Sequence, residues 1–284
     1  MNTKMIDVAG LSFSYGRKKS KVLDNFSMSL EKGAVYGLLG KNGTGKSTLF
    51  YLMAGLLRPQ TGKVLYKGVE VVKREPSTLQ DMFLVPEEFA LPNVSLKQYV
   101  KLNAPFYPSF SEEILKACLR DFDMNEDIHL GELSMGQKKK AFMCFALATN
   151  TSLLMMDEPS NGLDIPSKAQ LRRLIAENAS DDQLIIISTH QVKDLENLID
   201  PIIIMDKDGV VMNASIEEIT GKLSFTIENE KDSGALFVQQ DLRGYYTVRQ
   251  NFTGIETPVD LEVLFNCALV NKALFREMFN NNRR

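Results

Sequence analysis

Short apolar runs, each bounded by turn-forming or polar residues, predict the main strands of this chain. Residues 34–39 form one run flanked by glycine, residues 152–156 form a second, and residues 184–189 form a third. Continuous apolar runs of this length are typical of parallel strands buried on both faces. We therefore expect an α/β fold with a largely parallel central sheet.

The segment between the first two runs is predicted to be helical. Within residues 95–145, Ser95 is expected to open one helix and Ser111 to start another with a capping box. Pro105 and Pro108 should separate these two helices, because proline interrupts helical hydrogen bonding. A helical subdomain over about residues 90–145 follows from this pattern.

The pattern changes near residue 220, which divides the chain into a main domain (1–220) and a small C-terminal accessory region (221–284). Residues 221–251 alternate short apolar runs with turns and predict a small antiparallel sheet. Residues 260–279 carry apolar side chains at helical spacing. The accessory region holds no motif assignable to chemistry, so a packing appendage or dimer brace is a simpler interpretation than a ligand-binding regulatory domain.

Composition narrows the class of protein. The 284 residues are 44% hydrophobic, enough for one large core or one domain with an appendage. No apolar run approaches the eighteen or so residues that span a bilayer, and residues 141–148 read as a buried helix. The first residues lead into a strand without a signal-peptide pattern. These features predict a cytosolic enzyme subunit that does not insert into the membrane.

The cysteine content and the net charge argue against a disulfide-rich, a cysteine-ligated metal-binding or a nucleic-acid-binding protein. Cys118, Cys144 and Cys267 are too few and too scattered for a disulfide framework or a metal site, and we expect reduced core thiols. A formal net charge of −3 argues against a nucleic-acid-binding surface.

A glycine-rich loop after the first strand fits the phosphate-cradling pattern G-x-x-x-x-G-K-[ST]. Its glycines let backbone amides point at phosphates, and its lysine reaches the outer phosphates. Residues 46–57 read as a helix whose N-terminus would add partial positive charge, whereas a chance glycine-rich turn would not require this strand and helix around it. The predicted phosphate-binding residues are Gly40, Lys41, Asn42, Gly43, Thr44, Gly45, Lys46, Ser47 and Thr48.

A second motif, Leu-Ser-Met-Gly-Gln at residues 133–137, lies about twenty residues before the second strand. It resembles the signature of ATP-binding-cassette (ABC) ATPases, and the resemblance covers roughly residues 4–220. It implies a P-loop NTPase of ABC type, with a mixed sheet core, an antiparallel β subdomain and an inserted helical subdomain. In this family the signature, here Ser134, Gly136 and Gln137, serves the nucleotide held by the opposite subunit.

Two acidic residues end the second strand. Asp157 would reach the carboxyl edge of the sheet and hold Mg²⁺, through water, opposite the Ser47 hydroxyl. Glu158 would stand beside the water that attacks the γ-phosphate and act as the general base. Taken alone, an Asp-Glu pair after an apolar strand is just as readily explained as a cap on the next secondary-structure element. The phosphate loop and the signature motif favour the catalytic interpretation.

Three further positions match the family in order. Asp164 lies in the segment Ser-Asn-Gly-Leu-Asp, which resembles the loop that crosses to the partner subunit. The resemblance implies that His190 contacts the γ-phosphate, although a lone histidine at a strand end is often a hydrogen-bonded structural residue. Tyr15 stands where the family stacks an aromatic ring on adenine, and a half-buried strand residue is the alternative.

One position departs from the family. Glu87 stands where the family usually has a glutamine that contacts Mg²⁺ and senses the transmembrane partner. Glu88 would occupy this position if the alignment were shifted by one residue. The simplest alternative for both residues is an exposed acidic turn. A carboxylate can still face Mg²⁺, but it cannot donate an amide hydrogen bond. The departure puts the usual coupling geometry in doubt and leaves nucleotide binding unaffected.

The resemblance implies an ATP-binding and ATP-hydrolysing transporter subunit that uses ATP and Mg²⁺ and powers a transmembrane subunit on a separate chain. The stretch 103–110 is similar to the ATPase subunits of bacterial exporters, which implies a place at the cytoplasmic face of the inner membrane. Every half-site is present, so a homodimer is simplest, with a heterodimer as the alternative. Two other functions remain: a soluble ABC ATPase for assembly or repair, and a nucleotide-sensing module without turnover, which intact Glu158 and His190 disfavour.

Overall fold

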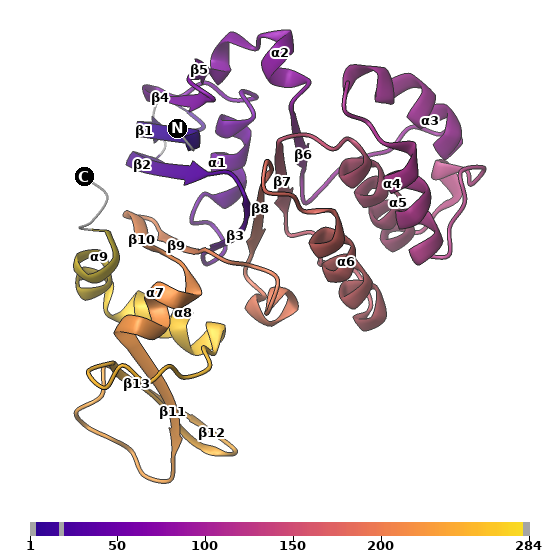
Figure 1. Cartoon of the computed structure of the whole chain (residues 1–284). Helices are drawn as coiled ribbons and strands as arrows, with labels where there is room; N and C mark the ends of the chain where they lie inside the picture. The colour runs from indigo at the N-terminus through magenta and orange to yellow at the C-terminus, as the bar shows by residue number, and fades with distance from the viewer. Residues whose placement is uncertain (1–3, 17–19, 281–284) are drawn as a thin grey trace.

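A six-stranded sheet forms the centre of the molecule, in the strand order β10-β9-β3-β8-β7-β6. The computed structural model describes residues 4–16 and 20–280, and Figure 1 shows the chain from its N- to its C-terminus. The strands of this sheet are β3 (Ala34–Leu39), β6 (Met82–Val85), β7 (Leu153–Asp157), β8 (Leu184–Thr189), β9 (Ile202–Asp206) and β10 (Gly209–Ala214). The three apolar runs of the sequence thus become the adjacent strands β3, β8 and β7.

The central strands run parallel, which brings their carboxyl ends to one edge. Strand β3 pairs in parallel with β8 and β9, and β7 pairs in parallel with β8 and β6; only β10 is antiparallel to its neighbour. In register, Leu39 lies beside Thr189, and Asp157 lies beside Ser188. The loops after β3, β6, β7 and β8 therefore emerge side by side, where open α/β sheets bind ligands.

An antiparallel sheet in the order β2-β1-β4-β5 covers one face of the central sheet together with α1 (Lys46–Met53). The helix buries Leu49, Phe50, Leu52 and Met53 completely, and each such side chain contributes about 1.5–3 kcal/mol. The remaining elements here are β1 (Lys4–Phe13), β2 (Leu23–Glu31), β4 (Thr61–Tyr66), β5 (Val69–Glu70), η1 (Val71–Lys73) and α2 (Pro76–Leu79).

The helix after the phosphate loop is shorter than predicted. It ends at Met53 rather than near residue 57. Gly55 has φ +65°, and a Cβ atom there would lie 2.6 Å from the Val71 carbonyl oxygen. The chain must turn at this close approach, so the apolar residues beyond it cannot extend the helix.

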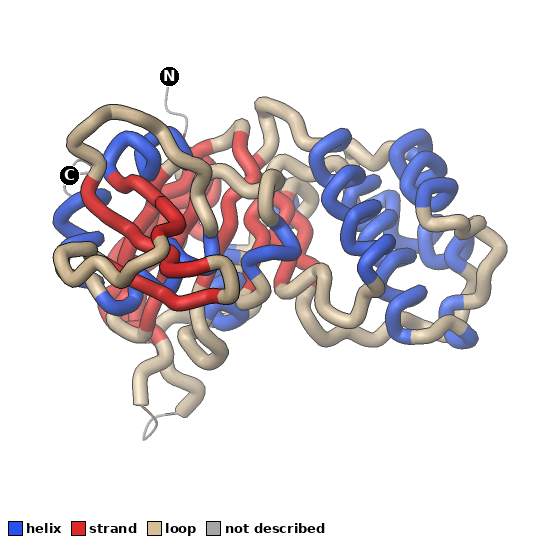
Figure 2. The backbone as a smooth tube through the Cα atoms, turned by 90° about the horizontal axis from the view of Figure 1, so that it is seen from below, coloured by secondary structure: helices blue, strands red, loops and turns tan. Residues whose placement is uncertain are grey.

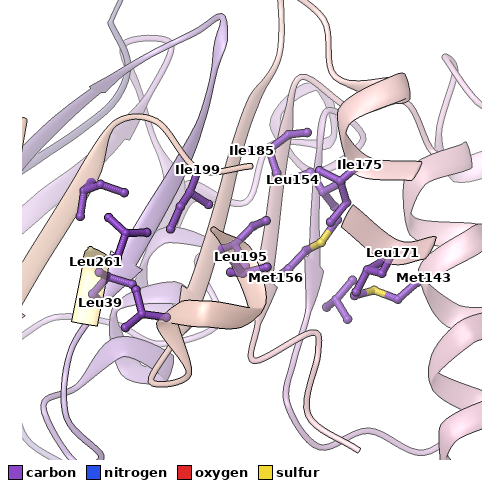
Figure 3. Close-up of a cluster of buried hydrophobic side chains, with 14 of the residues drawn as sticks. Leu39, Met143, Leu154, Met156, Leu171, Ile175, Ile185, Leu195, Ile199 and Leu261 are labelled. Carbon is purple, nitrogen blue, oxygen red and sulfur yellow. The ribbon is translucent and has the colours of Figure 1, made fainter. Parts of the chain in front are cut away.

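The opposite face of the central sheet is covered by α5 (Met135–Ala148), α6 (Ile165–Asn178) and α8 (Leu261–Val270). Figure 3 shows part of this cluster, where Met143 of α5 and Ile175 of α6 lie near Leu154 and Met156 of β7. Successive residues of β7 and β8 alternate between the two buried clusters because strand side chains point to opposite faces. Both faces are buried, which explains the continuous apolar runs.

The inserted helices form a separate lobe beside β6 and β7, seen at the right in Figures 1 and 2. It contains α3 (Leu96–Asn103), η2 (Ala104–Phe106), α4 (Glu112–Asp121), η3 (Leu130–Glu132) and α5. Ser95 and Ser111 cap their helices as predicted, but the capping box at Ser111 was wrong. The position that should carry Glu or Gln is Ile114, whereas Ser134 with Gln137 forms such a box.

The C-terminal region packs onto the main domain. Its elements are α7 (Ile216–Lys222), β11 (Leu223–Glu228), β12 (Phe237–Asp241), β13 (Gly244–Gln250), α8 and α9 (Lys272–Asn280), and the strands form an antiparallel sheet in the order β11-β13-β12. The predicted helical stretch is thus two helices, broken at Asn271, whose side-chain amide donates to the Leu236 carbonyl oxygen at 3.0 Å. Leu264 and Phe275 belong to the same buried cluster as Leu154. The domain boundary near residue 220 stays a prediction, and apolar packing is continuous across it.

Helix α8 also contacts η4 (Val192–Leu195), the segment that follows His190, and Leu195 and Leu261 belong to the same buried cluster. Cys118, Cys144 and Cys267 are buried free thiols, as expected. Within the described ranges, every helix is too short or too polar to cross a lipid bilayer.

Candidate active site

A cavity of about 390 Å³ opens at the carboxyl edge of the central sheet. Loops after β3, β6, β7 and β8 meet there, joined by Tyr15 and Val22 from the antiparallel subdomain. Its lining residues are Tyr15, Val22, Asn42, Gly43, Gly45, Lys46, Ser47, Thr48, Glu87, Asp157, Glu158 and His190. All but Val22 are residues predicted from the sequence, and their positions along the chain extend from Tyr15 to His190.

The phosphate loop takes the shape that its glycines require. Gly43 and Gly45 have φ of +79° and +99°, and a Cβ atom on Gly45 would lie 3.1 Å from the side chains of Val22 and Leu23. Gly45 is also the N-cap of α1, so the amides of the first helical turn point toward the loop. This geometry is an anion site of the type formed where a glycine-rich turn meets a helix N-terminus.

Lys46 is buried, and its ammonium is placed among carboxylates. Its Nζ donates to the Gly40 carbonyl oxygen at 2.7 Å and lies 3.9 Å from Oε1 of Glu158. Burial lowers the pKa of Lys46, while the negative charges of Glu158, Asp157 and Glu87 oppose that shift. A buried ammonium that faces an open cavity is a strong partner for a further anion.

Glu158 and His190 come together from adjacent strands. The Nδ1 atom of His190 is 2.8 Å from Oε1 of Glu158, and 34% of the histidine side chain is exposed. Glu158 itself is 4% exposed. Among the residues that the structure describes, the Glu158 Oε2 atom is a buried polar atom without a hydrogen-bond partner. A buried carboxylate with one oxygen that accepts no hydrogen bond can accept a proton from a water molecule beside it.

Asp157 is held by a strand neighbour that sequence reasoning missed. The Ser188 hydroxyl of β8 donates to Oδ1 of Asp157 and leaves Oδ2 for other partners. The strand register could have indicated this contact, because parallel neighbours at the sheet edge face the same way.

The donor chemistry of Ser47, Asp157 and Glu87 fits Mg²⁺. One hydroxyl and two carboxylates are hard oxygen ligands, and Mg²⁺ sites commonly combine one or two carboxylates with phosphate and water. The described residues contain no group of three or more His, Cys, Asp or Glu side chains arranged for a metal.

Tyr15 lies at the cavity mouth with 54% of its surface exposed. Its hydroxyl is 3.1 Å from Oγ1 of Thr48, and Phe13 packs edge-on against its ring at 5.0 Å between centroids. An exposed ring held from two sides provides a stacking surface for a flat base.

The signature and Asp164 lie away from this cavity. Ser134 caps α5 and Met135 is 65% exposed, so this segment faces outward. The Asp164 carboxylate caps α6 by accepting from the Ser167 amide at 2.9 Å. Neither they nor Gly40, Lys41 and Thr44 are among the lining residues. The structure of one chain thus brings the phosphate loop and the acidic pair together and leaves the signature free at the surface.

Comparisons with known proteins agree with this arrangement. A family model described as ABC transporter matches residues 23–161. The methionine import ATP-binding protein MetN of Carboxydothermus hydrogenoformans is 30% identical over 232 residues, which cover 76% of this chain and 67% of MetN.

A second relative is the lantibiotic transport ATP-binding protein SrtF of Streptococcus pyogenes. It is 30% identical over 200 residues, which cover 69% of this chain and 84% of SrtF. A solved ATP-binding subunit of an ABC transporter has a TM-score of 0.67 at 25% identity and covers 76% of this chain and 91% of that chain. The chain therefore belongs to the ABC transporter family, in which it is an ATP-binding subunit with ATPase chemistry.

Proposed function

We propose that this chain hydrolyses ATP at the cavity described above and thereby powers a separate transmembrane subunit that exports its substrate. The observation that supports the catalytic part most strongly is the convergence of Lys46, Glu158 and His190 in one cavity at the sheet edge. In this proposal the chain works at the cytoplasmic face of the inner membrane.

Each side chain has a distinct task in the proposed reaction. Lys46 and the loop amides bind the phosphates, and Tyr15 stacks on adenine. Glu158 accepts a proton from the attacking water, and His190 holds the γ-phosphate. Mg²⁺, held by Ser47, Asp157 and Glu87, would supply charge neutralisation at the phosphate oxygens.

The exposed signature supports a head-to-tail dimer with two composite sites. Ser134, Gly136 and Gln137 lie at the start of α5, where helix amides could stabilise a γ-phosphate held by a second subunit. The chain contains both halves of such a site, so a homodimer is the simplest assembly. A heterodimer with a related chain is the alternative.

We expect Glu158→Gln to form dimers when ATP is saturating, because the variant should bind ATP without consuming it. Light scattering should report a doubling of the molar mass. Adding Lys46→Ala to the same variant should restore the monomer, since binding is lost. A Glu158→Gln protein that stays monomeric at saturating ATP would remove the main support for this assembly.

Export as the direction of transport rests on the resemblance of residues 103–110 to exporter ATPase subunits. The relatives do not decide it, because an import subunit and a lantibiotic transport subunit match this chain at the same identity. The alternative function is a soluble ABC ATPase that drives assembly or repair.

Purification from detergent-extracted membranes of the native host separates the two functions. A tagged chain should retain a hydrophobic polypeptide with several membrane spans in stoichiometric amount. Recovery of the tagged chain only with water-soluble partners would favour the assembly or repair function. Flux in vesicles that contain the recovered complex would then measure the direction of transport.

A further inference from the structure

One lysine of α5 is buried beneath the acidic pair. Lys139 is 4% exposed, whereas its neighbours Lys138 and Lys140 are only partly covered. Its Nζ donates to the carbonyl oxygens of Glu158 at 2.8 Å and of Asn161 at 2.9 Å. Burying an ammonium is unfavourable unless it is hydrogen-bonded and its charge is balanced, so both contacts matter for its position.

The turn that Lys139 binds has an unusual backbone. Glu158 adopts φ +48°, in the left-handed region that residues other than glycine rarely occupy. The Asn161 amide donates to the Glu158 carbonyl oxygen at 3.2 Å. The Glu158 carbonyl oxygen therefore accepts hydrogen bonds from both Asn161 and Lys139. These two hydrogen bonds stabilise the turn that carries the Glu158 side chain.

The same turn is linked to two other loops of the cavity. The Asn161 side-chain amide donates to Oε1 of Glu87 at 3.1 Å, and its Oδ1 accepts from Nε2 of Gln191 at 3.4 Å. Asn161 thus joins the loop after β6 to the residue that follows His190. Lys139 anchors this junction from the signature helix.

Charge gives Lys139 a second effect. Among the residues that the structure describes, Asp157, Glu158 and Glu87 bring three carboxylates to the cavity, and Lys46 is the lysine that lines it. Burial lowers the pKa of Lys139, and the charge of Glu87 leads the carboxylates that oppose this shift. Asn161 connects the two groups, because its side chain donates to Glu87 and its backbone carbonyl oxygen accepts from Lys139. The extra negative charge at position 87, where the family usually carries a neutral glutamine, is thus linked to the buried ammonium through one residue.

We propose that Lys139 is a positioning residue for hydrolysis: it holds the Glu158–Asn161 turn in its strained conformation and offsets the charge that Glu87 adds to the site. This inference rests on the proposed role of Glu158 as the base. Because α5 begins at the signature, Lys139 also ties the backbone of Glu158 to the segment that would contact the second nucleotide.

Steady-state ATPase kinetics of Lys139→Gln test the proposal. The shorter neutral side chain should lower kcat at least tenfold and leave KM for ATP within about threefold, because the phosphate loop is untouched. Lys140→Gln is the matched control: it lies on the same helix and loses the same charge, but its ammonium lies over the Phe122 ring at 5.5 Å. Its kcat should stay within twofold of the parent.

A double-mutant cycle of Lys139→Gln and Glu87→Gln distinguishes an effect of the Lys139 charge from an effect of its packing. The fold loss of kcat that Lys139→Gln causes should be at least threefold smaller in the Glu87→Gln background, with Glu87→Gln alone as the reference, than in the parent background. Lys139→Met provides a second variant of similar side-chain length if the glutamine protein does not fold.

Two outcomes overturn the proposal: a folded Lys139 variant with the parent kcat, or the same loss of kcat in both Glu87 backgrounds. Glu158→Gln reports on the underlying function independently. If Glu158→Gln loses turnover while Lys139→Gln does not, only the role of Lys139 is wrong. If Glu158→Gln retains turnover, the proposed function itself is wrong.

Discussion

Glu158→Gln should lower the single-turnover rate of ATP hydrolysis by about 10² to 10⁴, the range for loss of a general base. The amide has nearly the same shape as the carboxylate, so the left-handed backbone at this position and the bond to Lys139 should persist. ATP affinity, measured by calorimetry, should stay within about threefold of the parent. Glu177→Gln, an exposed change on α6, is the control and should hydrolyse ATP normally.

The contact between Glu158 and His190 predicts that mutations of the two residues have coupled effects on the rate of hydrolysis. Since the two side chains are 2.8 Å apart, they should act as a unit, and His190→Ala should cost much less in the Glu158→Gln background than in the parent. Normal turnover in Glu158→Gln would mean that another group acts as the base.

Lys46→Ala should weaken ATP binding by about 10²-fold or more. The ammonium would make charge-assisted hydrogen bonds to the outer phosphates, each worth about 1.5–3 kcal/mol, and 1.4 kcal/mol is a tenfold change in affinity. Calorimetry with ATP and Mg²⁺ measures the loss.

Lys63→Ala, an exposed change on β4, is the charge-matched control for Lys46→Ala and should bind ATP as the parent does. Circular dichroism should establish that the Lys46 variant is folded, because its ammonium also binds the Gly40 carbonyl oxygen. An affinity for ATP within about threefold of the parent would count against the phosphate-loop assignment.

Local sequence determined the three central strands β3, β7 and β8 and the phosphate loop. Residues 34–39 and 184–187 carry almost continuous apolar side chains because both faces of their strands are buried, and such runs are typical of interior strands. The loop between Gly40 and Thr48 was equally readable, since glycines at left-handed positions and an adjoining helix N-terminus are local requirements.

Element boundaries depended on contacts that the local pattern does not contain. The first helix ends early because Gly55 approaches the Val71 carbonyl oxygen, and the last helical stretch breaks where Asn271 binds Leu236. The absence of a capping box at Ser111, in contrast, could have been predicted from the sequence, because Ile114 occupies the position that must be Glu or Gln.

The sequence alone determined which charged, polar and aromatic side chains the cavity contains, because each belongs to a short motif next to a strand. Only the tertiary structure decided how those groups are supported. Lys139 looks like one of three solvated lysines in a row, and Asn161 looks like a turn residue. Their roles come from the packing of α5 against the end of β7, which buries the ammonium against the Glu158 carbonyl oxygen. That contact joins residues 19 positions apart through the fold, and no periodicity along the chain encodes it.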